Sequence, residues 1–317
     1  MLGNAYTSVI NGIDAVSVKV EADISAGFPC FDITGNLGVA VRESRERVRM
    51  AIKNSGIRIV PARMIVNISP ADLRKEGTHY DLAVAVAVLQ AAGIIRQNLC
   101  ENIMFIGELG LNGELRPVRG VLPMVINWCK GGRQMVVLPR ENAMEASYVK
   151  DAKIIPASTL NEVIECIKGN FTEVPFEHAK PLQSTEYGMD FADIHGQLSL
   201  KRAIMVAAAS MHNMLMIGPP GAGKTMAAER IPAILPPMTY EQQLELSGIY
   251  SVAGMLKDGV SFVDKRCFRA PHHCITPQAM AGGGNGLMPG EVSLACHGVL
   301  FICLLYTSDA ADDLIGV

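Results

Sequence analysis

The order of hydrophobic and polar positions predicts β structure at the start of the chain, followed by a helix. Residues 15–24 alternate between apolar and polar side chains, which is the period of a half-buried strand, and residues 31–33 are a second strand candidate. Residues 39–55 place apolar side chains at helical intervals among four arginines, and Gly56 follows as a stop signal. The pattern predicts an amphipathic helix there.

Strand-like and helix-like patterns of apolar residues then alternate along the first half of the chain. Strands are expected at 64–68, 103–106, 134–138 and 153–155, and helices at 81–92, 121–130, 141–148 and 160–168. Alternation of this kind predicts an α/β domain.

The periodicity disappears after residue 169 into a polar stretch that contains Pro175 and Pro181, a composition typical of a linker. We therefore expect one domain at 1–170, a linker at 171–188 and a second domain from 189. The second domain begins with a predicted helix at 199–210, a buried strand at 214–217 and a further helix after a glycine-rich turn.

Composition and charge narrow the classes of protein that fit. The 317 residues carry 28 Lys and Arg against 31 Asp and Glu, so the chain lacks the broad basic field of a dedicated duplex-DNA module. Any contact with nucleic acid must be local or made by an assembly. The eight cysteines form no C-x-x-C pair and no signal peptide opens the chain, which predicts a reducing cytoplasm. The longest apolar tracts, 82–89 and 298–306, are too short for a membrane span.

The strongest chemical motif follows the predicted strand at 214–217. Its residues are Gly218, Pro219, Pro220, Gly221, Ala222, Gly223, Lys224 and Thr225, which match the P-loop pattern G-x-x-x-x-G-K-[ST]. For this composition we expect on the order of 0.01 accidental matches. The alternative, a glycine-rich turn with a solvated lysine, explains neither the Lys-Thr pair nor its position between strand and helix.

The spacing of this motif suits a nucleotide phosphate chain. Glycines at 221 and 223 let backbone N–H groups turn inward, and the helix that follows offers its positive N-terminal end. Lys224 is expected to reach the β- and γ-phosphates, and the Thr225 hydroxyl to coordinate Mg²⁺. Pro232 should stop this helix near Arg230.

Residues 190–302 resemble the magnesium-chelatase-like AAA+ ATPases, and in particular the ComM/YifB competence-protein group. The resemblance rests on the P-loop and on Asp190-Phe-Ala-Asp193-Ile-His-Gly196-Gln197, Lys201-Arg202-Ala203, His212-Asn213, Phe268-Arg-Ala-Pro-His272-His273, Gly282-Gly283-Gly284 and Pro289-Gly-Glu291-Val-Ser-Leu. It implies that Ile194, Gly196 and Gln197 line an adenine pocket. It also implies that 239–291 hold an insertion facing the pore of a ring.

Two segments allow other interpretations. Cys267, His272, His273 and Cys274 are plausible zinc ligands, but no second ligand pair follows at a structural-site spacing, so we favour a structural or pore-loop role. The glycines at 282–286 resemble a second phosphate cradle, but no Lys-Ser/Thr pair follows them. We interpret them as a flexible loop.

The chain departs from the family after Ile302. The family continues this strand with the Asp-Glu pair that positions Mg²⁺ and water, whereas Cys303 and Leu304 stand here. We also expect this chain to lack the family's sensor residues, arginine finger and helical lid. Residues 303–317 resemble a translated sequencing-library adapter, and we expect them to be a non-native tail. This chain is then expected to bind ATP without completing the catalytic site.

Residues 1–170 resemble the Lon-protease and ribosomal-S5 domain-2 fold. The match rests on Pro70-Ala-Asp-Leu-Arg-Lys75-Glu-Gly77-Thr-His-Tyr-Asp81-Leu and Gly107-Glu108-Leu-Gly-Leu-Asn-Gly113-Glu-Leu-Arg-Pro117-Val. His79 and Leu122 occupy the positions of the Lon serine and lysine, so no peptidase activity is expected. We interpret His79 as a packed or hydrogen-bonded surface residue rather than a general base.

A second candidate surface lies on the helix at 39–55. Arg42, Arg45 and Arg49 share one face that has the spacing to touch phosphates. We favour a solvated face paired with Glu43 and Glu46, because the net charge gives no support to DNA binding by the monomer.

The resemblance implies a cytoplasmic ATPase that uses ATP and Mg²⁺, assembles as a ring, in all expectation a hexamer, and moves on DNA in branch migration during transformation. No membrane partner is expected. One alternative is a magnesium-chelatase ATPase subunit for porphyrin metallation, which the long Lon-like domain disfavours. The other is a nucleotide-binding fragment without turnover. Stimulation of ATPase activity by forked DNA, by chelatase partners or by neither distinguishes the three.

Overall fold

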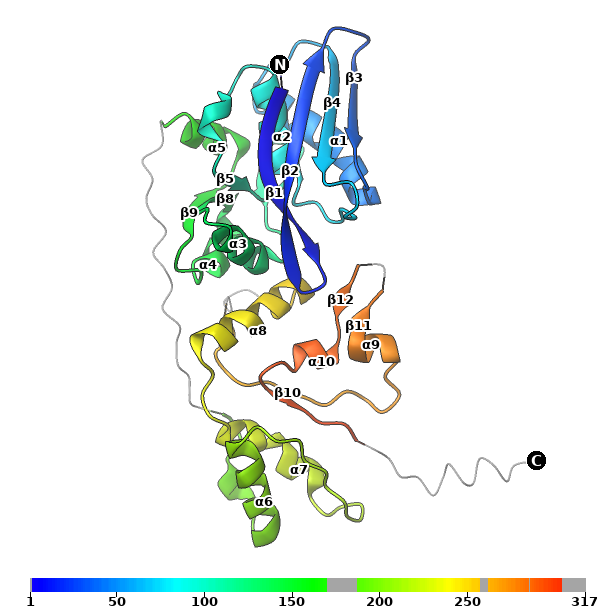
Figure 1. Cartoon of the computed structure of the whole chain (residues 1–317), viewed down its shortest axis with the longest axis vertical. Helices are drawn as coiled ribbons and strands as arrows, with labels where there is room; N and C mark the ends of the chain where they lie inside the picture. Colours follow the sequence, from blue (N-terminus) through cyan, green and yellow to red (C-terminus); the bar gives the residue numbers. More distant parts are fainter. Residues whose placement is uncertain (1, 170–186, 257–261, 285, 304–317) are drawn as a thin grey trace, which may run out of the picture. The chain divides into compact units, whose positions relative to one another are not determined.

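The computed structural model describes residues 2–169, 187–256, 262–284 and 286–303 (Figure 1). The chain divides into two compact units, Met1–Lys180 with Ser247–Phe262, and Pro181–Leu246 with Val263–Val317. Most of the expected linker at 171–188, and all but the first residue of the expected tail at 303–317, lie outside the described residues. Within the described part of the chain, no helix is long and apolar enough to cross a membrane.

The first unit is built on one mixed sheet in which parallel pairs predominate. Its spatial order is β3-β4-β2-β1-β5-β8-β9; β1 pairs antiparallel with β2, and β2 with β4, while the other four pairs are parallel. The strands are β1 (Leu2–Asn11), β2 (Asp14–Ser25), β3 (Cys30–Thr34), β4 (Arg63–Ser69), β5 (Ile103–Phe105), β8 (Met135–Pro139) and β9 (Lys153–Ala157), with a separate hairpin of β6 (Glu108–Leu109) and β7 (Leu115–Arg116).

The helices of the first unit pack on this sheet. α2 contacts β1, β2 and α1, and all eleven of its residues are buried, so its sequence is apolar on every side except at the polar residues Asp81 and Gln90. The helices are α1 (Val39–Asn54), α2 (Asp81–Ala91), α3 (Val121–Lys130), α4 (Ala143–Ala146) and α5 (Leu160–Ile167), with 3-10 turns at Gln97–Leu99 and Arg140–Asn142.

Most of the predicted elements of this half are confirmed, but two predictions need correction. The first strand, β1, was not expected; it forms a hairpin with β2 through Gly12, whose φ of 67° favours glycine. The helix expected at 141–148 is a 3-10 turn followed by the short α4. Asn142 interrupts the expected helix, because its side chain points to Val118 instead of solvent. Its Oδ1 accepts a hydrogen bond from the Val118 N–H, and its Nδ2 donates one to the Val118 carbonyl.

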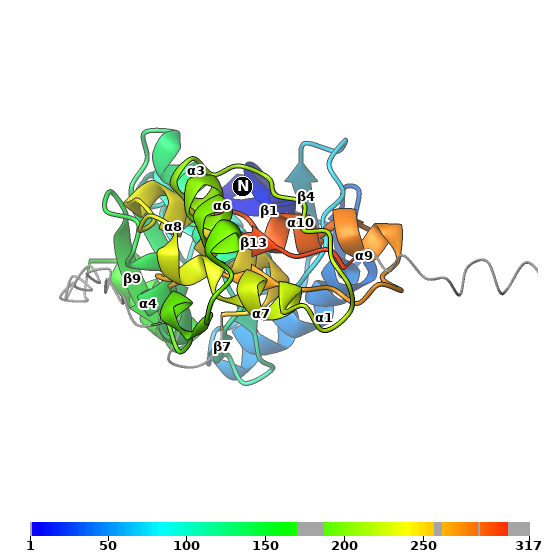
Figure 2. The same ribbon diagram turned by 90° about the horizontal axis from the view of Figure 1, so that it is seen from below.

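The second unit has little sheet in its described residues. β10 (Phe268–Arg269) pairs parallel with β13 (Val299–Leu300), and β11 (Gly282–Gly283) pairs antiparallel with β12 (Met288–Pro289). The helices are η3 (Phe191–Asp193), α6 (Leu198–Ala209), α7 (Lys224–Glu229), η4 (Ile231–Ile234), α8 (Tyr240–Ala253), α9 (Pro277–Ala281) and α10 (Glu291–Leu294). α6 and α7 lie side by side, and both contact η4 (Figures 1 and 2).

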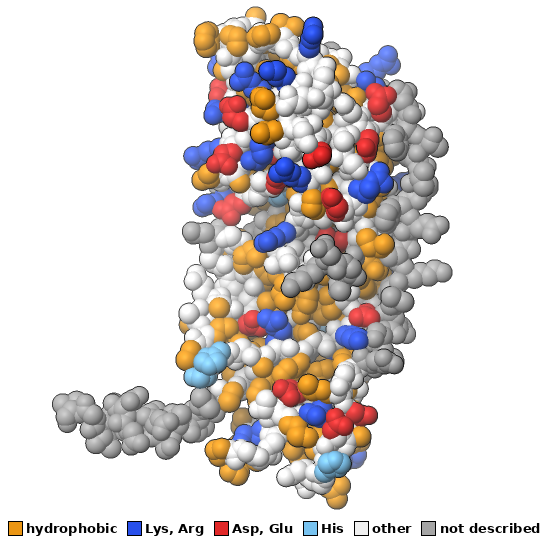
Figure 3. Space-filling model, turned by 180° about the vertical axis from the view of Figure 1, so that it is seen from behind, with side chains coloured by type: hydrophobic (Ala, Val, Ile, Leu, Met, Phe, Trp, Pro, Cys, Tyr) orange, Lys and Arg blue, Asp and Glu red, His pale blue; other side chains and the backbone are white. Residues whose placement is uncertain are grey.

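The strand expected at residues 214–217 is not formed. The segment is apolar, as predicted, but Leu215 and Ile217 are 71% and 90% exposed, and none of the described strands pairs with it. A strand is stabilised by hydrogen bonds to a neighbour, which this segment lacks within the described residues. Hydrophobic side chains accordingly reach the surface where α6 and α7 lie, in the lower part of Figure 3.

α8 contributes to both units. Its residues from Ser247 onward belong to the first unit, where the backbone N–H of Gly120 donates to the Ser251 carbonyl at 3.2 Å and the Ser251 hydroxyl bonds the Glu145 carboxylate. Phe262, which follows α8, stacks on Tyr148 with ring centroids 4.1 Å apart. A segment that comes after the P-loop in sequence therefore completes the packing of the first unit.

Candidate functional site

The P-loop motif forms an exposed turn that leads directly into α7. Gly221 and Gly223 have φ values of 77° and 79°, a conformation that strongly favours glycine, and Gly223 is the residue before the helix. α7 ends at Glu229, and η4 with Pro232 follows at once, so the predicted helix stop near Arg230 is confirmed.

Lys224 turns back into this loop. Its Nζ donates to the carbonyls of Gly218 and Pro219 at 2.7 and 2.8 Å, which holds the ammonium group on the inner side of the turn. Among the described backbone hydrogen bonds, the N–H groups of Gly223, Lys224 and Thr225 donate to no backbone carbonyl. The loop therefore presents a cation and several amide donors together, the groups that bind a phosphate chain. Thr225 is exposed beside them.

The residues expected to line an adenine pocket lie next to the P-loop helix. Ile194 is 5% exposed and packs in a small apolar cluster with Ile204 of α6 and Ala227 of α7. Gly196 and Gln197 form the turn into α6 with positive φ values, and both are exposed. The segment of 194–197 is thus positioned beside α7.

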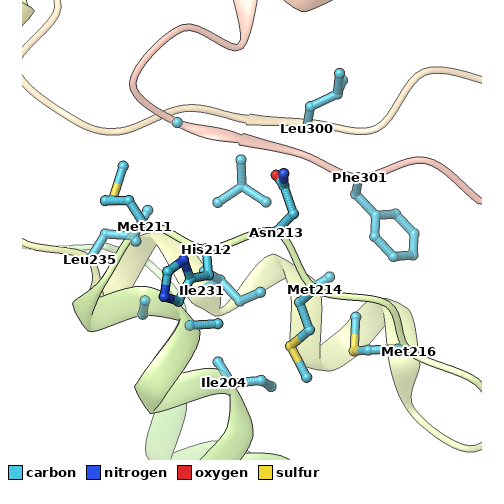
Figure 4. Close-up of a pocket in the computed structure, with 15 residues that line it drawn as sticks. Ile204, Met211, His212, Asn213, Met214, Met216, Ile231, Leu235, Leu300 and Phe301 are labelled. Carbon is cyan, nitrogen blue, oxygen red and sulfur yellow. The ribbon is translucent and has the colours of Figure 1, made fainter.

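A cavity of about 240 Å³, with both polar and apolar atoms in its lining, lies between the segment that precedes the P-loop and the strand β13. Figure 4 shows Asn213, Met214 and Met216 on one side, and Leu300 and Phe301 on the other. The rest of the lining comes from α6, α7, η4 and their adjoining turns, and from Gly298 and Val299 at β13. The segment 214–217 and β13 lie on different sides of this cavity and do not pair as strands.

The structure brings two of the resemblance motifs together. Arg269 donates two hydrogen bonds to the Glu291 carboxylate, at 2.7 and 2.5 Å, in a bidentate ion pair that sequence reasoning did not predict. Gly282 and Gly283 (β11) pair with Met288 and Pro289 (β12), so the flexible-loop interpretation of 282–286 is wrong for its first two residues. A Cβ on Gly282 would lie 2.8 Å from the backbone of Met288, and glycine is therefore needed for strand approach.

The two positions of the Lon dyad are buried in the first unit and hold His79 and Leu122 in place of the serine and the lysine. His79 is 6% exposed rather than on the surface as expected; its Nε2 lies 2.8 Å from the Ser8 carbonyl, and its ring is 4.0 Å from that of Tyr80. Burial lowers the pKa of His79 to about 4, opposed by the Ser8 hydrogen bond. Leu122 is fully buried. The absence of peptidase activity stays a prediction.

The arginine face of α1 is exposed as predicted, and Arg45 pairs with Glu46 at 3.3 Å. Arg47 was not among the arginines of the predicted face. Its guanidinium holds Asp81 in place by donating hydrogen bonds to both carboxylate oxygens, at 2.7 and 3.0 Å. Asp81 is fully buried, and its desolvation raises the pKa of this carboxyl against the effect of its hydrogen bonds with Arg47 and Ser44.

The four residues considered above as zinc ligands, for which a structural or pore-loop role was favoured, lie in two places. His272, His273 and Cys274 are exposed and keep their ligand atoms within 4.8 Å of one another. Cys267 does not join them; its Sγ donates to the carbonyl of Leu294 at 3.3 Å, beside β13. The C-x₄-H-H-C set is therefore not one site in this structure.

The fold and the motif define an α/β protein with a P-loop, and two family models match it. Residues 190–307 match "Magnesium chelatase, subunit ChlI", and residues 20–142 match "Subunit ChlI of Mg-chelatase". The chain belongs to the magnesium-chelatase-like family that includes ComM and YifB.

Curated relatives match nearly the whole chain. An uncharacterised protein of Mycobacterium tuberculosis is 40% identical over 302 residues, and the competence protein ComM of Haemophilus influenzae is 38% identical over 308 residues. In each case the match covers 95% of this chain and 60% of the relative, so the chain spans about 60% of their length. The Lon protease of Trichlorobacter lovleyi is 25% identical over 191 residues, which cover 55% of this chain and 23% of the protease.

Proposed function

We propose that residues 218–225 bind ATP with Mg²⁺, and that the whole protein is an AAA+ ATPase. The observation that carries this proposal is the turn that holds the Lys224 ammonium against the carbonyls of Gly218 and Pro219 at the N-terminus of α7. Family membership supports it, because ATP and Mg²⁺ are typical of magnesium-chelatase-like proteins.

Each residue of the loop has a distinct expected role. On binding, Lys224 exchanges its two carbonyl acceptors for phosphate oxygens, and the amides of Gly223 and Thr225 donate to the same chain of phosphates. The Thr225 hydroxyl holds Mg²⁺. Ile194, Gly196 and Gln197 contact the adenine from the side of α6.

We further propose that the intact protein forms a cytoplasmic ring, of six subunits by resemblance, and couples ATP hydrolysis to DNA remodelling. The relationship to a protein named for competence supports this role. Cys303 and Leu304 stand where the family has its acidic pair, so we propose that this chain binds ATP without turnover. The chelatase alternative draws support from the names of the matching family models.

The test of nucleotide binding is calorimetric titration of the full chain with a non-hydrolysable ATP analogue and Mg²⁺. Hydrogen bonds to charged groups are worth about 1.5–3 kcal/mol, so Lys224→Ala should weaken binding by ~tenfold or more. Lys168→Ala, which removes an exposed lysine paired with Glu165, is the matched control and should bind normally. Equal affinity of wild type and Lys224→Ala would refute the assignment.

A second experiment distinguishes the larger roles. A full-length version that restores the acidic pair after Ile302 is assayed for ATP hydrolysis with forked DNA and, separately, with chelatase partner subunits. Stimulation by forked DNA supports the DNA-remodelling role. Stimulation only by chelatase partners supports the metallation role, and no turnover supports a nucleotide-binding scaffold.

A further inference from the structure

Three side chains with different ligand atoms converge beside β13 in the second unit. They are Glu245 of α8, and Cys296 and His297 in the turn between α10 and β13. A carboxylate oxygen, the thiol sulfur and a ring nitrogen all lie within 4.8 Å of one another. The His297 Nε2 is 2.7 Å from the Glu245 Oε2. The set joins residues that are about fifty positions apart in sequence.

The turn that carries two of these residues is held by backbone contacts and a buried cation. The N–H of Cys296 donates to the Ser293 carbonyl at 3.1 Å, and that of Gly298 to the Ala295 carbonyl at 2.9 Å. Arg266, which is 5% exposed, donates to the His297 carbonyl at 2.5 Å. The cluster therefore sits on a fixed part of the unit rather than on a free loop.

The burial of the cluster suits a bound cation. Cys296 and His297 are half-buried, whereas Glu245 is exposed, so one side stays open to water. Cys267 lies against the same turn, since a Cβ added at Gly298 would overlap it, but its Sγ is engaged with the Leu294 carbonyl. Three protein ligands and one water position are thus available.

We propose that Glu245, Cys296 and His297 form a zinc site. Zn²⁺ accepts thiolate, imidazole and carboxylate ligands together in tetrahedral geometry, and water takes the fourth position where the protein supplies three. Mg²⁺ and Ca²⁺ prefer sites made of oxygen atoms alone, which this mixed set is not. Bound zinc ties α8 to the turn that leads into β13. None of its three residues belongs to the proposed nucleotide site.

The exposed cluster of His272, His273 and Cys274 is the competing location. Its three residues follow one another in one loop, and the Nδ1 of His272 already accepts a hydrogen bond from the Cys274 N–H at 3.3 Å. Within the described part of the chain, no ligand from another element joins it. This cluster therefore serves as an internal control.

The experiment titrates the full chain with Zn²⁺ and then with Co²⁺, after chelator treatment, without nucleotide and in a reductant that does not bind metals. We expect one equivalent of tight Zn²⁺ and a thiolate-to-cobalt charge-transfer band in the near ultraviolet. Cys296→Ser should abolish the band, and His297→Ala should weaken Zn²⁺ binding by at least ~tenfold. Cys267→Ser and Cys274→Ser, matched cysteine controls, should keep the band.

Two results would overturn the proposal. One is the absence of tight Zn²⁺ binding by the wild-type chain, and the other is a band that survives Cys296→Ser. Circular dichroism of the metal-free variants establishes that they are folded. If Cys296→Ser fails to fold, Glu245→Gln keeps the shape of the side chain and removes the charged ligand, and unchanged Zn²⁺ affinity in that variant contradicts the site.

Discussion

The buried histidine of the first unit predicts a defined dependence of stability on pH. The pKa of His79 falls from 6.5 to about 4 on folding, mainly because burial disfavours the charged imidazolium. Between these values the unfolded chain binds a proton that the folded chain does not. Stability is therefore present above pH 6.5 and is lost as the pH falls toward 4.

The size of this effect follows from linkage. At pH 5 the unfolded state is almost fully protonated at this position and the folded state is almost neutral, which corresponds to a loss of about 2 kcal/mol relative to pH 7.5. The variant His79→Gln cannot ionise and retains an N–H that can donate to the Ser8 carbonyl. Its free energy of unfolding should therefore lack the pH-dependent part that comes from protonation of His79.

The assay is urea denaturation followed by the fluorescence of Trp128, the chain's single tryptophan, which is buried in the first unit. Other groups titrate equally in both proteins, so the measured quantity is the difference in unfolding free energy between wild type and His79→Gln. This difference should shift by about 2 kcal/mol between pH 7.5 and 5. His195→Gln, at an exposed histidine, is the control. A constant difference across this range would refute the buried, neutral histidine.

Three further substitutions test the packing of the first unit. Arg47→Ala should lower the free energy of unfolding by about 3–5 kcal/mol, because it leaves the buried Asp81 carboxylate without its cation. Arg45→Ala, at an exposed ion pair, should lower it by less than about 1 kcal/mol. A similar loss in both variants would contradict the buried pair. Burial raises the pKa of Glu145 against its hydrogen bonds, so wild-type stability should fall as the pH rises through that pKa, and Glu145→Gln should remove this slope in the same denaturation assay. Thr159→Ala removes the side-chain cap of α5 and should lower the unfolding free energy by about 1 kcal/mol; an unchanged midpoint would show that the cap contributes nothing.

The sequence predicted the helices and central strands well where one face was clearly apolar. α1, α2 and α3 begin and end within one residue of their expected bounds, because a continuous apolar stripe or an all-apolar run specifies each of them. β1 was missed for a physical reason. Several of its inward positions carry small or polar residues such as Gly3 and Thr7, and a Cβ at Gly3 would overlap the Ala87 carbonyl of α2.

The sequence predicted the candidate functional site only where its residues are contiguous along the chain. The P-loop residues are contiguous, so their turn and helix follow from glycine and lysine spacing. The strand before them was predicted from its apolar run, but a strand also requires a neighbour, which no local pattern reveals. The burial of His79 and the convergence of Glu245 with His297 depend on contacts between distant segments, and sequence spacing carries no information on these.

Because residues Ser247–Phe262 complete the first unit, that unit is discontinuous along the chain. During synthesis from the N-terminus, its last packing element emerges only after the P-loop region has been made. A fragment that stops after α5 leaves Glu145 without its Ser251 partner and Tyr148 without its stacked ring. Cleavage within residues 171–188 would therefore leave the last packing element of the first unit on the C-terminal product.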